Sequence, residues 1–246
     1  MSSVSDSALA WRQYRLERHM FWRNPAAAVF NIVIPIIFLV VIGSLAGDQA
    51  ERDIIVPGIA GMNVLATTFS ALGHNMTYLR ETGVLKRIHG TPIPTRSYLT
   101  ALFGNTFVNS IFQILLVVVA GYLFFGLPWP NDWFELLVYS VLGIITFSSL
   151  GVAYSYVIPN YESAAAYVNF VYLPAILLGG VFFTSDQVGI VLHTISGILP
   201  ISHFVDGMRA AIVSGYPLSQ HLKDLVILSA WGVFGVIVAV RGFRWE

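Results

Sequence analysis

The chain has 246 residues, of which 56% are hydrophobic and 11% are charged, against roughly 45–50% and 25% in soluble domains. One soluble core cannot hide that apolar excess, so the composition predicts an integral membrane protein. The net charge of zero gives no support for nucleic-acid binding, and the absence of cysteine excludes disulfides and thiolate metal sites.

The first predicted element is an amphipathic helix at residues 8–24, within a cytoplasmic N-terminal segment of residues 1–24. Four basic residues of this helix fall on one arc: Arg12, Arg15, His19 and Arg23. Aromatic and aliphatic side chains flank this arc. This composition predicts a helix lying among anionic lipid headgroups. A plain basic flank of the first membrane span explains the same residues equally well and implies the same orientation.

Residues 25–246 contain apolar runs long enough to span a membrane, since about 20 helical residues cross the hydrocarbon core. Six spans are predicted: residues 25–46, 54–77, 98–125, 133–158, 164–183 and 222–240. The predicted fold is therefore an all-α integral membrane protein with a six-helix transmembrane domain. Small residues such as Ser148 and Gly151 in the fourth span favour close helix packing.

Polar side chains recur at helical spacing in two of the spans. In the second span they share one face, at Asn63, Thr67, Ser70, His74 and Thr77. In the third span, amide side chains lie four positions apart, at Asn105, Asn109 and Gln113. Such stripes face other helices or water rather than lipid. We expect a hydrogen-bonded packing role for His74, in preference to a role in proton coupling.

The segment between the fifth and sixth spans is irregular. Residues 188–199 are apolar but too few to cross a membrane, which predicts a re-entrant or interfacial piece. Residues 200–212 are predicted to form a second short amphipathic helix, with Asp206 and Arg209 three positions apart. Short re-entrant helices are therefore expected between these spans.

The distribution of lysine and arginine sets the predicted orientation. Ten of the thirteen lie in the N-terminal segment, in the loop at residues 78–97 and in the C-terminal tail. The other three are Arg52, Arg209 and Lys223. We therefore expect both termini and the 78–97 loop to lie in the cytoplasm.

Sequence motifs for catalysis are missing. Neither lysine follows a glycine, no histidine is followed by glutamate, and no Gly-x-Ser-x-Gly elbow occurs. The carboxylates lie in loops or at span ends, without a catalytic pair inside the bundle. The chain is therefore predicted not to be an enzyme and to hold no metal or cofactor of its own.

The 78–97 loop contains a short predicted helix between two long apolar runs. Thr82 is expected to cap its start, and Gly90 with Pro92 to end it. One side of the helix is apolar and consists of Val84, Leu85 and Ile88. The basic residues Lys86, Arg87 and His89 point elsewhere. One interpretation is a basic loop resting on anionic headgroups. The other is a knob that fits a cleft on a cytoplasmic protein, and moving such a knob would tilt both attached spans.

Two segments also resemble a known family. Residues 80–92 read Arg-Glu-Thr-Gly-Val-Leu-Lys-Arg-Ile-His-Gly-Thr-Pro. They resemble the Arg-Glu-x-Gly-Thr-Leu-Glu-Arg-Leu-x-x-Thr-Pro pattern of ABC type-2 transporter permeases, the drug- and lipid-exporter kind that includes daunorubicin-resistance permeases. Residues 199–209, Leu-Pro-Ile-Ser-His-Phe-Val-Asp-Gly-Met-Arg, are similar to the segment before the last span of that family. The six-span layout with an N-terminal amphipathic helix is similar too.

The resemblance implies the permease subunit of an ATP-driven exporter for drugs, antibiotics or lipids in a prokaryotic cell membrane. Two copies of a cytoplasmic ABC ATP-binding subunit would bind ATP and Mg, and a second, identical permease would complete a homodimer. The residues implied in coupling to the ATPase are Arg80, Glu81, Gly83, Val84, Leu85, Lys86, Arg87, Ile88 and His89. Those implied in the outer re-entrant segment are Pro200, Asp206 and Arg209.

Polar residues on three spans are candidates for the substrate path: Asn31, Asn63, Thr67, Ser70, Asn169 and Tyr172. Interhelical hydrogen bonds that hold the bundle together are an equally good explanation for them. The mostly apolar walls favour an amphipathic, drug-like or lipid-like substrate, moved by alternating access. The alternative function is a membrane assembly factor that recruits a cytoplasmic protein without transport. An intramembrane enzyme fits less well, because catalytic residues are missing.

Overall fold

A computed structural model describes residues 6–91, 93–184, 189–215 and 218–242. The side chains of residues 6, 26–28, 30, 31, 95 and 96 are outside this description, and so is the predicted path residue Asn31 beyond its place in a helix. Helices and short connections make up the described residues, and no β-strand occurs among them. The all-α prediction is therefore confirmed for this part of the chain.

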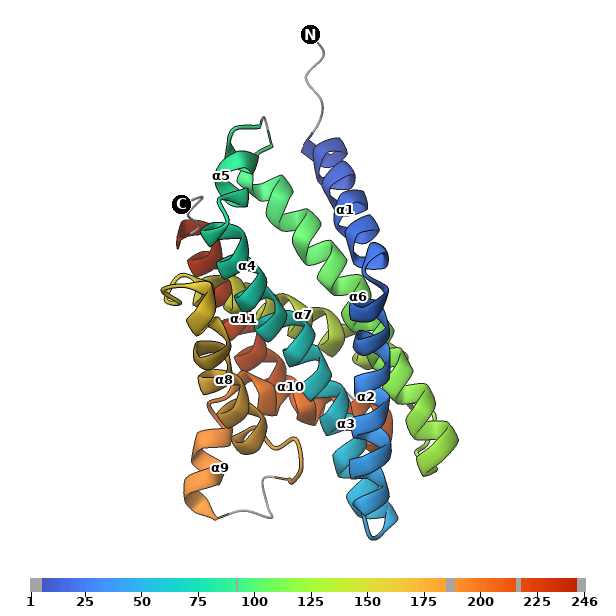
Figure 1. Ribbon diagram of the computed structural model, residues 1–246. Coiled ribbons are helices and arrows are strands. Elements are labelled where there is room, and N and C mark those ends of the chain that lie inside the picture. Colours follow the sequence, from blue (N-terminus) through green and yellow to red (C-terminus); the bar gives the residue numbers. More distant parts are fainter. Residues whose placement is uncertain (1–5, 92, 185–188, 216–217, 243–246) are drawn as a thin grey trace.

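The helices follow one another with short turns (Figure 1). In chain order they are α1 (Asp6–Arg23), α2 (Pro25–Leu45), α3 (Gln49–Leu65), the π-helix η1 (Ala66–Ser70), α4 (Ala71–Glu81), α5 (Val84–His89), α6 (Thr95–Phe125), α7 (Trp133–Ser155), α8 (Tyr161–Leu178), α9 (Ile190–Ser196), α10 (Pro200–Arg209), the π-helix η3 (Ala210–Ser214), the 3-10 helix η4 (Leu218–His221) and α11 (Leu222–Gly242).

Local sequence explains where several helices begin and end. The side-chain oxygens of Asp48, Asp132 and Asn160 accept backbone N–H groups in the first turns of α3, α7 and α8, which satisfies donors that have no partner within the helix. Gly126 ends α6 with a φ of 69°, a backbone conformation that glycine adopts without a steric penalty.

Four helices within the described residues are long and apolar enough to cross a membrane: Gln49–Glu81, Ser97–Phe125, Trp133–Ser155 and Leu218–Gly242. The pair Ile190–Ser196 and Pro200–Ser214, bent by 90°, would raise the number to five if it counts as one span. The predicted spans at 25–46 and 164–183 form helices α2 and α8, which are not among the four. The protein is thus a multi-pass membrane protein, and the predicted number of six goes beyond this finding.

Helix α7 is at the centre of the bundle and packs most extensively against α11. A Cβ atom on Gly232 or Gly235 of α11 would come within 2.7 Å of Thr146 Oγ1 or 2.4 Å of Ser149 Oγ, respectively. Thr146 Oγ1 also donates a hydrogen bond to the Leu228 carbonyl at 3.1 Å. The close packing that the small residues of the fourth span predicted is therefore present.

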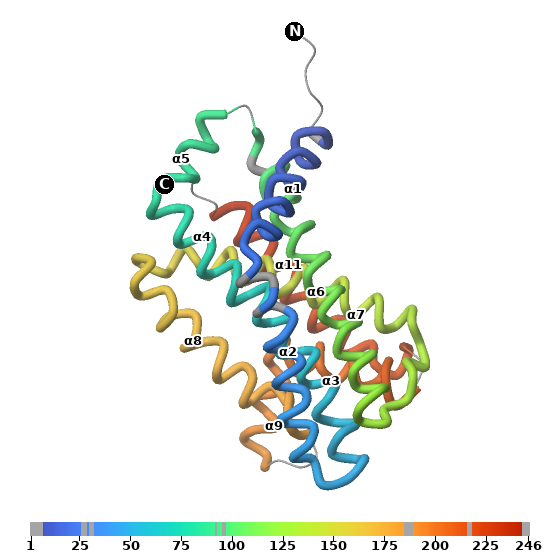
Figure 2. The backbone as a smooth tube through the Cα atoms, turned by 45° about the vertical axis from the view of Figure 1, so that its right-hand side comes forward, coloured from blue at the N-terminus to red at the C-terminus, as the bar shows by residue number. Residues whose placement is uncertain are grey.

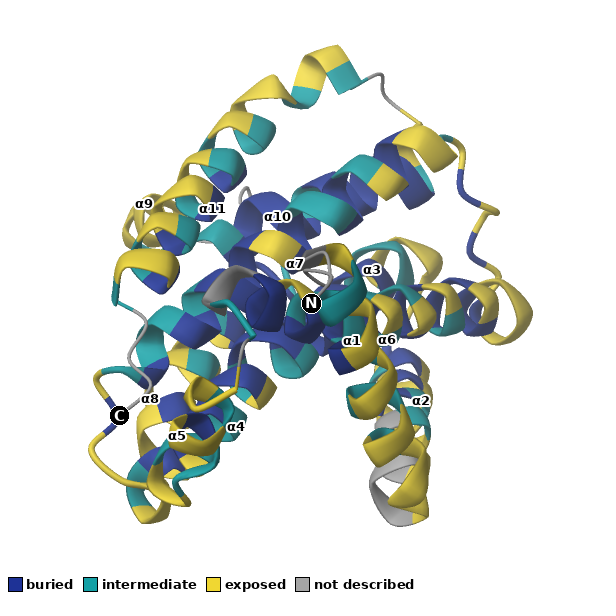
Figure 3. Cartoon of the chain, turned by 90° about the horizontal axis from the view of Figure 1, so that it is seen from above, coloured by how far each residue is buried: buried dark blue, intermediate teal, exposed yellow. Residues whose placement is uncertain are grey.

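Helix α10 is buried along nearly all of its length (Figure 3), and Pro200 and Asp206 are its partly buried residues. Its Phe204 ring packs against Gly143 of α7, and the Tyr139 ring packs against Gly207. The short helix predicted at residues 200–212 is therefore present, and it lies in the core. Three of its four polar residues, Ser202, His203 and Arg209, are buried as well.

Helix α1 runs alongside the first half of α6 and continues into α2 (Figure 2). Arg18 of α1 donates a hydrogen bond to the amide oxygen of Asn109, a member of the predicted amide stripe on α6. Gln13 of α1 is buried, whereas the basic arc that includes Arg12 and Arg15 is exposed. One residue of the stripe thus holds two helices together, as a packing role requires.

Candidate functional site

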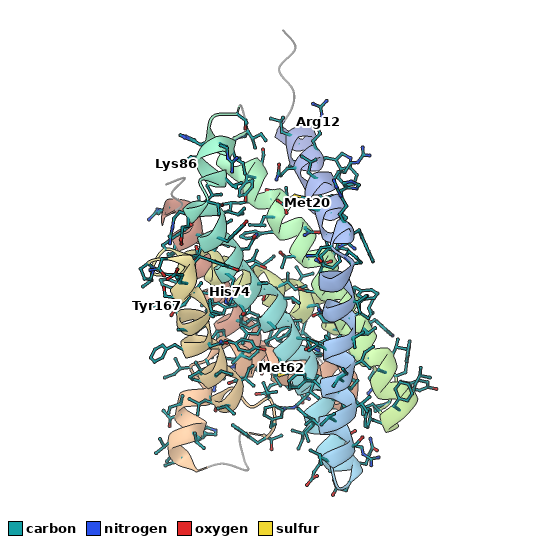
Figure 4. The ribbon with its side chains drawn as sticks, in the orientation of Figure 1. Arg12, Met20, Met62, His74, Lys86 and Tyr167 are labelled. Atoms are coloured by element: carbon teal, nitrogen blue, oxygen red, sulfur yellow. The ribbon has the colours of Figure 1, made fainter. Side chains whose placement is uncertain are left out.

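The predicted coupling loop lies at one end of the molecule, here called the loop end. Figure 4 shows Lys86 of α5 at this end, at the same level as Arg12 of α1. The last turn of α11 reaches the same end, whereas α9 and the turn between α2 and α3 lie at the opposite end, here called the far end (Figure 1). The grouping of basic segments that the charge distribution predicted is therefore present in space.

The turn from α4 into α5 depends on Gly83, whose φ of 70° is in the left-handed region. Such a φ strains any residue with a Cβ atom. Gly83, not Thr82, is the N-cap of α5, so the predicted capping role of Thr82 is wrong. The Thr82 hydroxyl instead donates to the Tyr78 carbonyl at 2.8 Å, because the sharp turn leaves Thr82 on the last turn of α4.

The apolar side of α5 packs onto this chain itself. Leu85 is only 2% exposed and belongs to a loop-end core that α4, α6, α7 and α11 share: Leu72, Met76, Leu85, Tyr98, Leu99, Leu102, Val152 and Ala239. Val84 and Ile88 are half-buried, whereas Lys86, Arg87 and His89 are exposed. A partner that approaches α5 therefore meets its basic residues, while its apolar residues fix the helix to the bundle.

Arg80 and Glu81, the first two residues of the family-like motif, reach the turn between α7 and α8. Arg80 donates from Nη1 to the Ser155 carbonyl at 3.0 Å and from Nη2 to the Ile158 carbonyl at 2.5 Å. Glu81 accepts the backbone N–H of Tyr161. The sequence did not suggest these contacts, because they join residues 75 to 80 positions apart that share no periodic pattern.

The predicted polar stripe on the second span is divided by the π-helix η1. Thr67 Oγ1 lies 3.1 Å from Ser110 Oγ of α6, so this part of the stripe faces α6. His74 Nδ1 lies 2.8 Å from the Ser70 carbonyl one turn earlier, a hydrogen bond within the helix. A π-helix adds a residue to one turn, so the regular spacing in the sequence does not give one continuous face.

The candidate path residues do not all line one space. Asn63 is buried at 6% exposure, Asn169 is exposed on α8, and Ser70 is half-buried. Tyr172 lines an apolar groove of about 340 Å³ between α8, α7 and α11, here called the α8 groove. Its walls combine aliphatic side chains with aromatic ones, among them Phe69, Phe147, Tyr154, Trp231 and Phe234. The α8 groove can hold an apolar group of moderate size.

The far end is fixed by Arg209 of α10. Its guanidinium donates to the carbonyls of Ile54, Gly180 and Val181 and, at 2.9 Å, to the carboxylate of Asp206. Pro200 occupies the first turn of the same helix, where its missing N–H costs nothing. The family resemblance assigned Pro200, Asp206 and Arg209 to an outer re-entrant segment, which stays a prediction; the structure joins Asp206 and Arg209 directly.

The described part of the chain contains no group of three or more His, Asp or Glu side chains that could hold a metal ion. The His203 ring lies 2.6 Å from Asp224 and 3.0 Å from the Gly197 carbonyl, so both of its nitrogens have protein partners. The polar residues of the bundle therefore act mainly on one another and on backbone groups.

Comparison with known proteins agrees with these features. Residues 7–213 match the family described as ABC-2 type transporter. "Inner membrane transport permease YadH" of Escherichia coli K12 is 23% identical over 82% of this chain and 77% of its own length. "Putative transport permease YvfS" of Bacillus subtilis 168 is 23% identical over 85% and 86%.

A third relative is longer than this chain. "Probable multidrug ABC transporter permease YbhS" of Escherichia coli K12 is 24% identical over 92% of this chain and 53% of its own length. All three relatives carry the word permease in their names. Together with the family match over most of its length, this shows that the chain belongs to the ABC-2 type transporter family and is the membrane permease of an ABC transporter.

Proposed function

We propose that this protein is the permease subunit of an ATP-driven exporter, powered by a separate cytoplasmic ABC ATP-binding subunit. The observation that carries the proposal is the arrangement of α5 in a chain of this family. Leu85 fixes α5 in the loop-end core, while Lys86, Arg87 and His89 are exposed at the tip. A helix held in this way can receive a push from a partner and pass it to α4 and α6, to which it is directly joined.

The proposed assembly contains two identical permeases and two ATPase subunits, with ATP and Mg bound by the ATPase. The loop end faces the cytoplasm, as the lysine and arginine distribution favours. Helices α2 and α8 complete six spans, and the α9–α10 pair is a re-entrant segment at the outer side. Closure of the ATPase pair biases the bundle between inward-open and outward-open states.

The proposed substrate is amphipathic, either drug-like or lipid-like. The α8 groove supports this class, because its walls are almost entirely apolar and the side chains that line it include Tyr172 and Tyr154. An apolar group that leaves water for this groove gains roughly 25 cal/mol per Å² of buried surface. A strongly hydrated ion or a sugar chain would lose its hydration without compensation there.

The test is co-purification followed by transport. We expect the tagged permease to bind an ABC ATPase encoded in the same organism and to raise its ATP hydrolysis in proteoliposomes. The triple variant Lys86→Ala/Arg87→Ala/His89→Ala should lose this binding, while the exposed control Arg241→Ala keeps it. Binding without ATP-dependent movement of any amphipathic substrate would instead support a non-transporting recruitment factor.

A further inference from the structure

The two ends of the α7–α8 turn are both held by the last residues of α4. The C-terminal carbonyls of a helix and the N-terminal N–H groups of the next have no partners within their own helices. Arg80 supplies donors to the carbonyls of Ser155 and Ile158. Glu81 supplies an acceptor to the N–H of Tyr161, the first residue of α8. Neighbouring residues of α4 thus complete the end of α7 and the start of α8.

Aromatic packing strengthens the same junction. The rings of Tyr78 and Tyr161 are 5.2 Å apart and tilted by 64°, an edge-on arrangement that aromatic pairs favour. Tyr78 lies one turn before Glu81 on α4, so the ring contact and the hydrogen bonds come from one short stretch. Three side chains of α4 therefore grip one turn.

Helix α8 packs less extensively on its neighbours than the other long helices do. Within the described residues, α8 packs chiefly against α4 and η1. Its other side borders the α8 groove, and Phe170, Leu173 and Leu177 are 78%, 52% and 61% exposed. A helix that packs on one neighbour and borders a groove on the other side can follow its neighbour, and its position sets the width of the groove.

We propose that Arg80 and Glu81 are positioning residues that clamp the α7–α8 turn to α4, so that α8 moves together with the coupling loop and opens or closes the α8 groove. This inference rests on the proposed function for the source of the movement. It divides the motif at residues 80–89 into two parts. Lys86, Arg87 and His89 receive the movement from the ATPase, and Arg80 with Glu81 pass it on to α8.

The chemistry of the clamp differs from that of an ion pair with the ATPase. A backbone N–H needs an acceptor but no negative charge, so Glu81→Gln keeps the bond to Tyr161 and Glu81→Ala loses it. An ion pair with a basic residue of the ATPase would be lost in both variants. Arg80→Lys supplies one compact ammonium in place of a planar fork, so it can replace only part of the two bonds.

Distance measurements test the clamp in the permease alone. The natural chain has no cysteine, so Arg87→Cys and Ala165→Cys, both at exposed positions, place spin labels specifically on α5 and α8. We expect one narrow distance distribution in this background. Arg80→Ala/Glu81→Ala should broaden it, and an unchanged width would overturn the clamp.

The matched control is Thr82→Ala in the same labelled background. Thr82 is exposed in the same turn, and its hydroxyl bond to Tyr78 stays within α4. The control should therefore leave the distribution narrow. Equal broadening by Thr82→Ala would show a general loosening of the loop and would also contradict the clamp.

The second readout is the amount of ATP hydrolysed per substrate molecule moved by the complete transporter. Arg80→Ala and Glu81→Ala should keep ATPase binding and hydrolysis but raise this ratio severalfold, and Glu81→Gln should restore it. Loss of ATPase binding in both Glu81 variants would overturn the clamp in favour of an ion pair. If the unmodified permease binds no ATPase, the proposed function is wrong. The width of the spin-label distance distribution still tests the clamp in that case.

Discussion

Arg80 at the loop end and Arg209 at the far end use the same chemistry in different surroundings. Each guanidinium donates to backbone carbonyls at or just after the end of a helix, and Arg209 also donates to the Ile54 carbonyl inside α3. Arg209 is 8% exposed and also pairs with Asp206, whereas Arg80 is only half-buried. The carbonyls that Arg80 binds belong to Ser155 and Ile158, which are 2% and 1% exposed, so the two sites differ in the exposure of the arginine and not of all its acceptors.

The comparison shows that burial decides whether such a joint is permanent. A buried acceptor left without a partner costs about 1–3 kcal/mol, so separating Arg209 from its carbonyl partners at the far end is strongly unfavourable. At the loop end, the half-buried Arg80 is already partly hydrated, so separating its contacts costs less. The far end therefore acts as a fixed closure between α3, α10 and the segment that follows α8, whereas the loop end is a clamp with a lower cost of opening. The predictions below test this difference, from the largest expected effect to the smallest.

Replacing Arg209 should have the largest effect. Arg209→Met leaves several buried carbonyls and the Asp206 carboxylate without their donor, which should destabilise the protein by roughly 3–5 kcal/mol. Thermal unfolding in detergent, followed by size-exclusion chromatography, measures this. Arg241→Met, at an exposed position, is the control. A melting temperature for Arg209→Met equal to that of the control would contradict the fixed closure.

Truncation of the Leu85 side chain should have the second-largest effect on stability. Leu85→Ala removes a side chain that is 2% exposed in the loop-end core, and such a change costs about 2–5 kcal/mol. Lys86→Ala at the neighbouring exposed position should change the melting temperature little. The same unfolding measurement compares the two. Equal stability of both variants would show that α5 is not fixed through its apolar side.

Two glycines should lose different amounts of stability, for different reasons, when a methyl group is added. A Cβ on Gly58 would lie 1.9 Å from the Val181 carbonyl oxygen, so Gly58→Ala must push apart the backbone beside the Arg209 site, at about 1–3 kcal/mol or more. Gly83→Ala meets open space but has a φ of 70°, which costs about 1–2 kcal/mol. A larger loss of stability in Gly83→Ala than in Gly58→Ala would contradict the expectation that the far end is the less tolerant of the two ends.

The smallest effect concerns Glu17 on α1, near the loop end. Burial raises the pKa of the Glu17 carboxyl, and a 3.0 Å hydrogen bond from Gln13 only partly offsets this. The protonated form is thus favoured in the folded state, and this stabilisation is lost as pH rises through the raised pKa. Melting temperatures between pH 4 and 7 should show a decline that Glu17→Gln flattens. The exposed control Glu162→Gln should leave the decline in place.

The sequence predicted the long elements well, because an apolar run of about 20 residues has few alternatives to a spanning helix. The predicted starts at residues 25, 98, 133 and 222 lie within three residues of the observed helices. The distribution of lysine and arginine alone predicted that the N-terminal segment, the 78–97 loop and the end of the last span lie at one end of the molecule. The residues of the Arg209–Asp206 pair were found through their spacing and through family resemblance.

What the sequence did not predict are contacts between distant segments. The grip of Arg80 and Glu81 on the α7–α8 turn has no periodic signature, and neither has the burial of α10 against Gly143. Thr82 was misassigned because a capping residue and a residue in the last turn of a helix look alike in sequence. Glycine at position 83 was the better signal, since its positive φ sets the turn.

The π-helix η1 lets the second span hold one residue more than a regular α-helix with the same rotation. Each residue of an α-helix turns it by roughly 100°, so a regular α-helix through all five residues of Ala66–Ser70 would rotate α4 by about that angle relative to α3 and point Arg80 and Glu81 away from the α7–α8 turn. Deleting one residue within Ala66–Ser70 would instead restore a regular α-helix and leave α4 in nearly the same rotation. A single-residue gap at this place in a relative's sequence would therefore mark a permease that can keep the same contacts at its coupling loop.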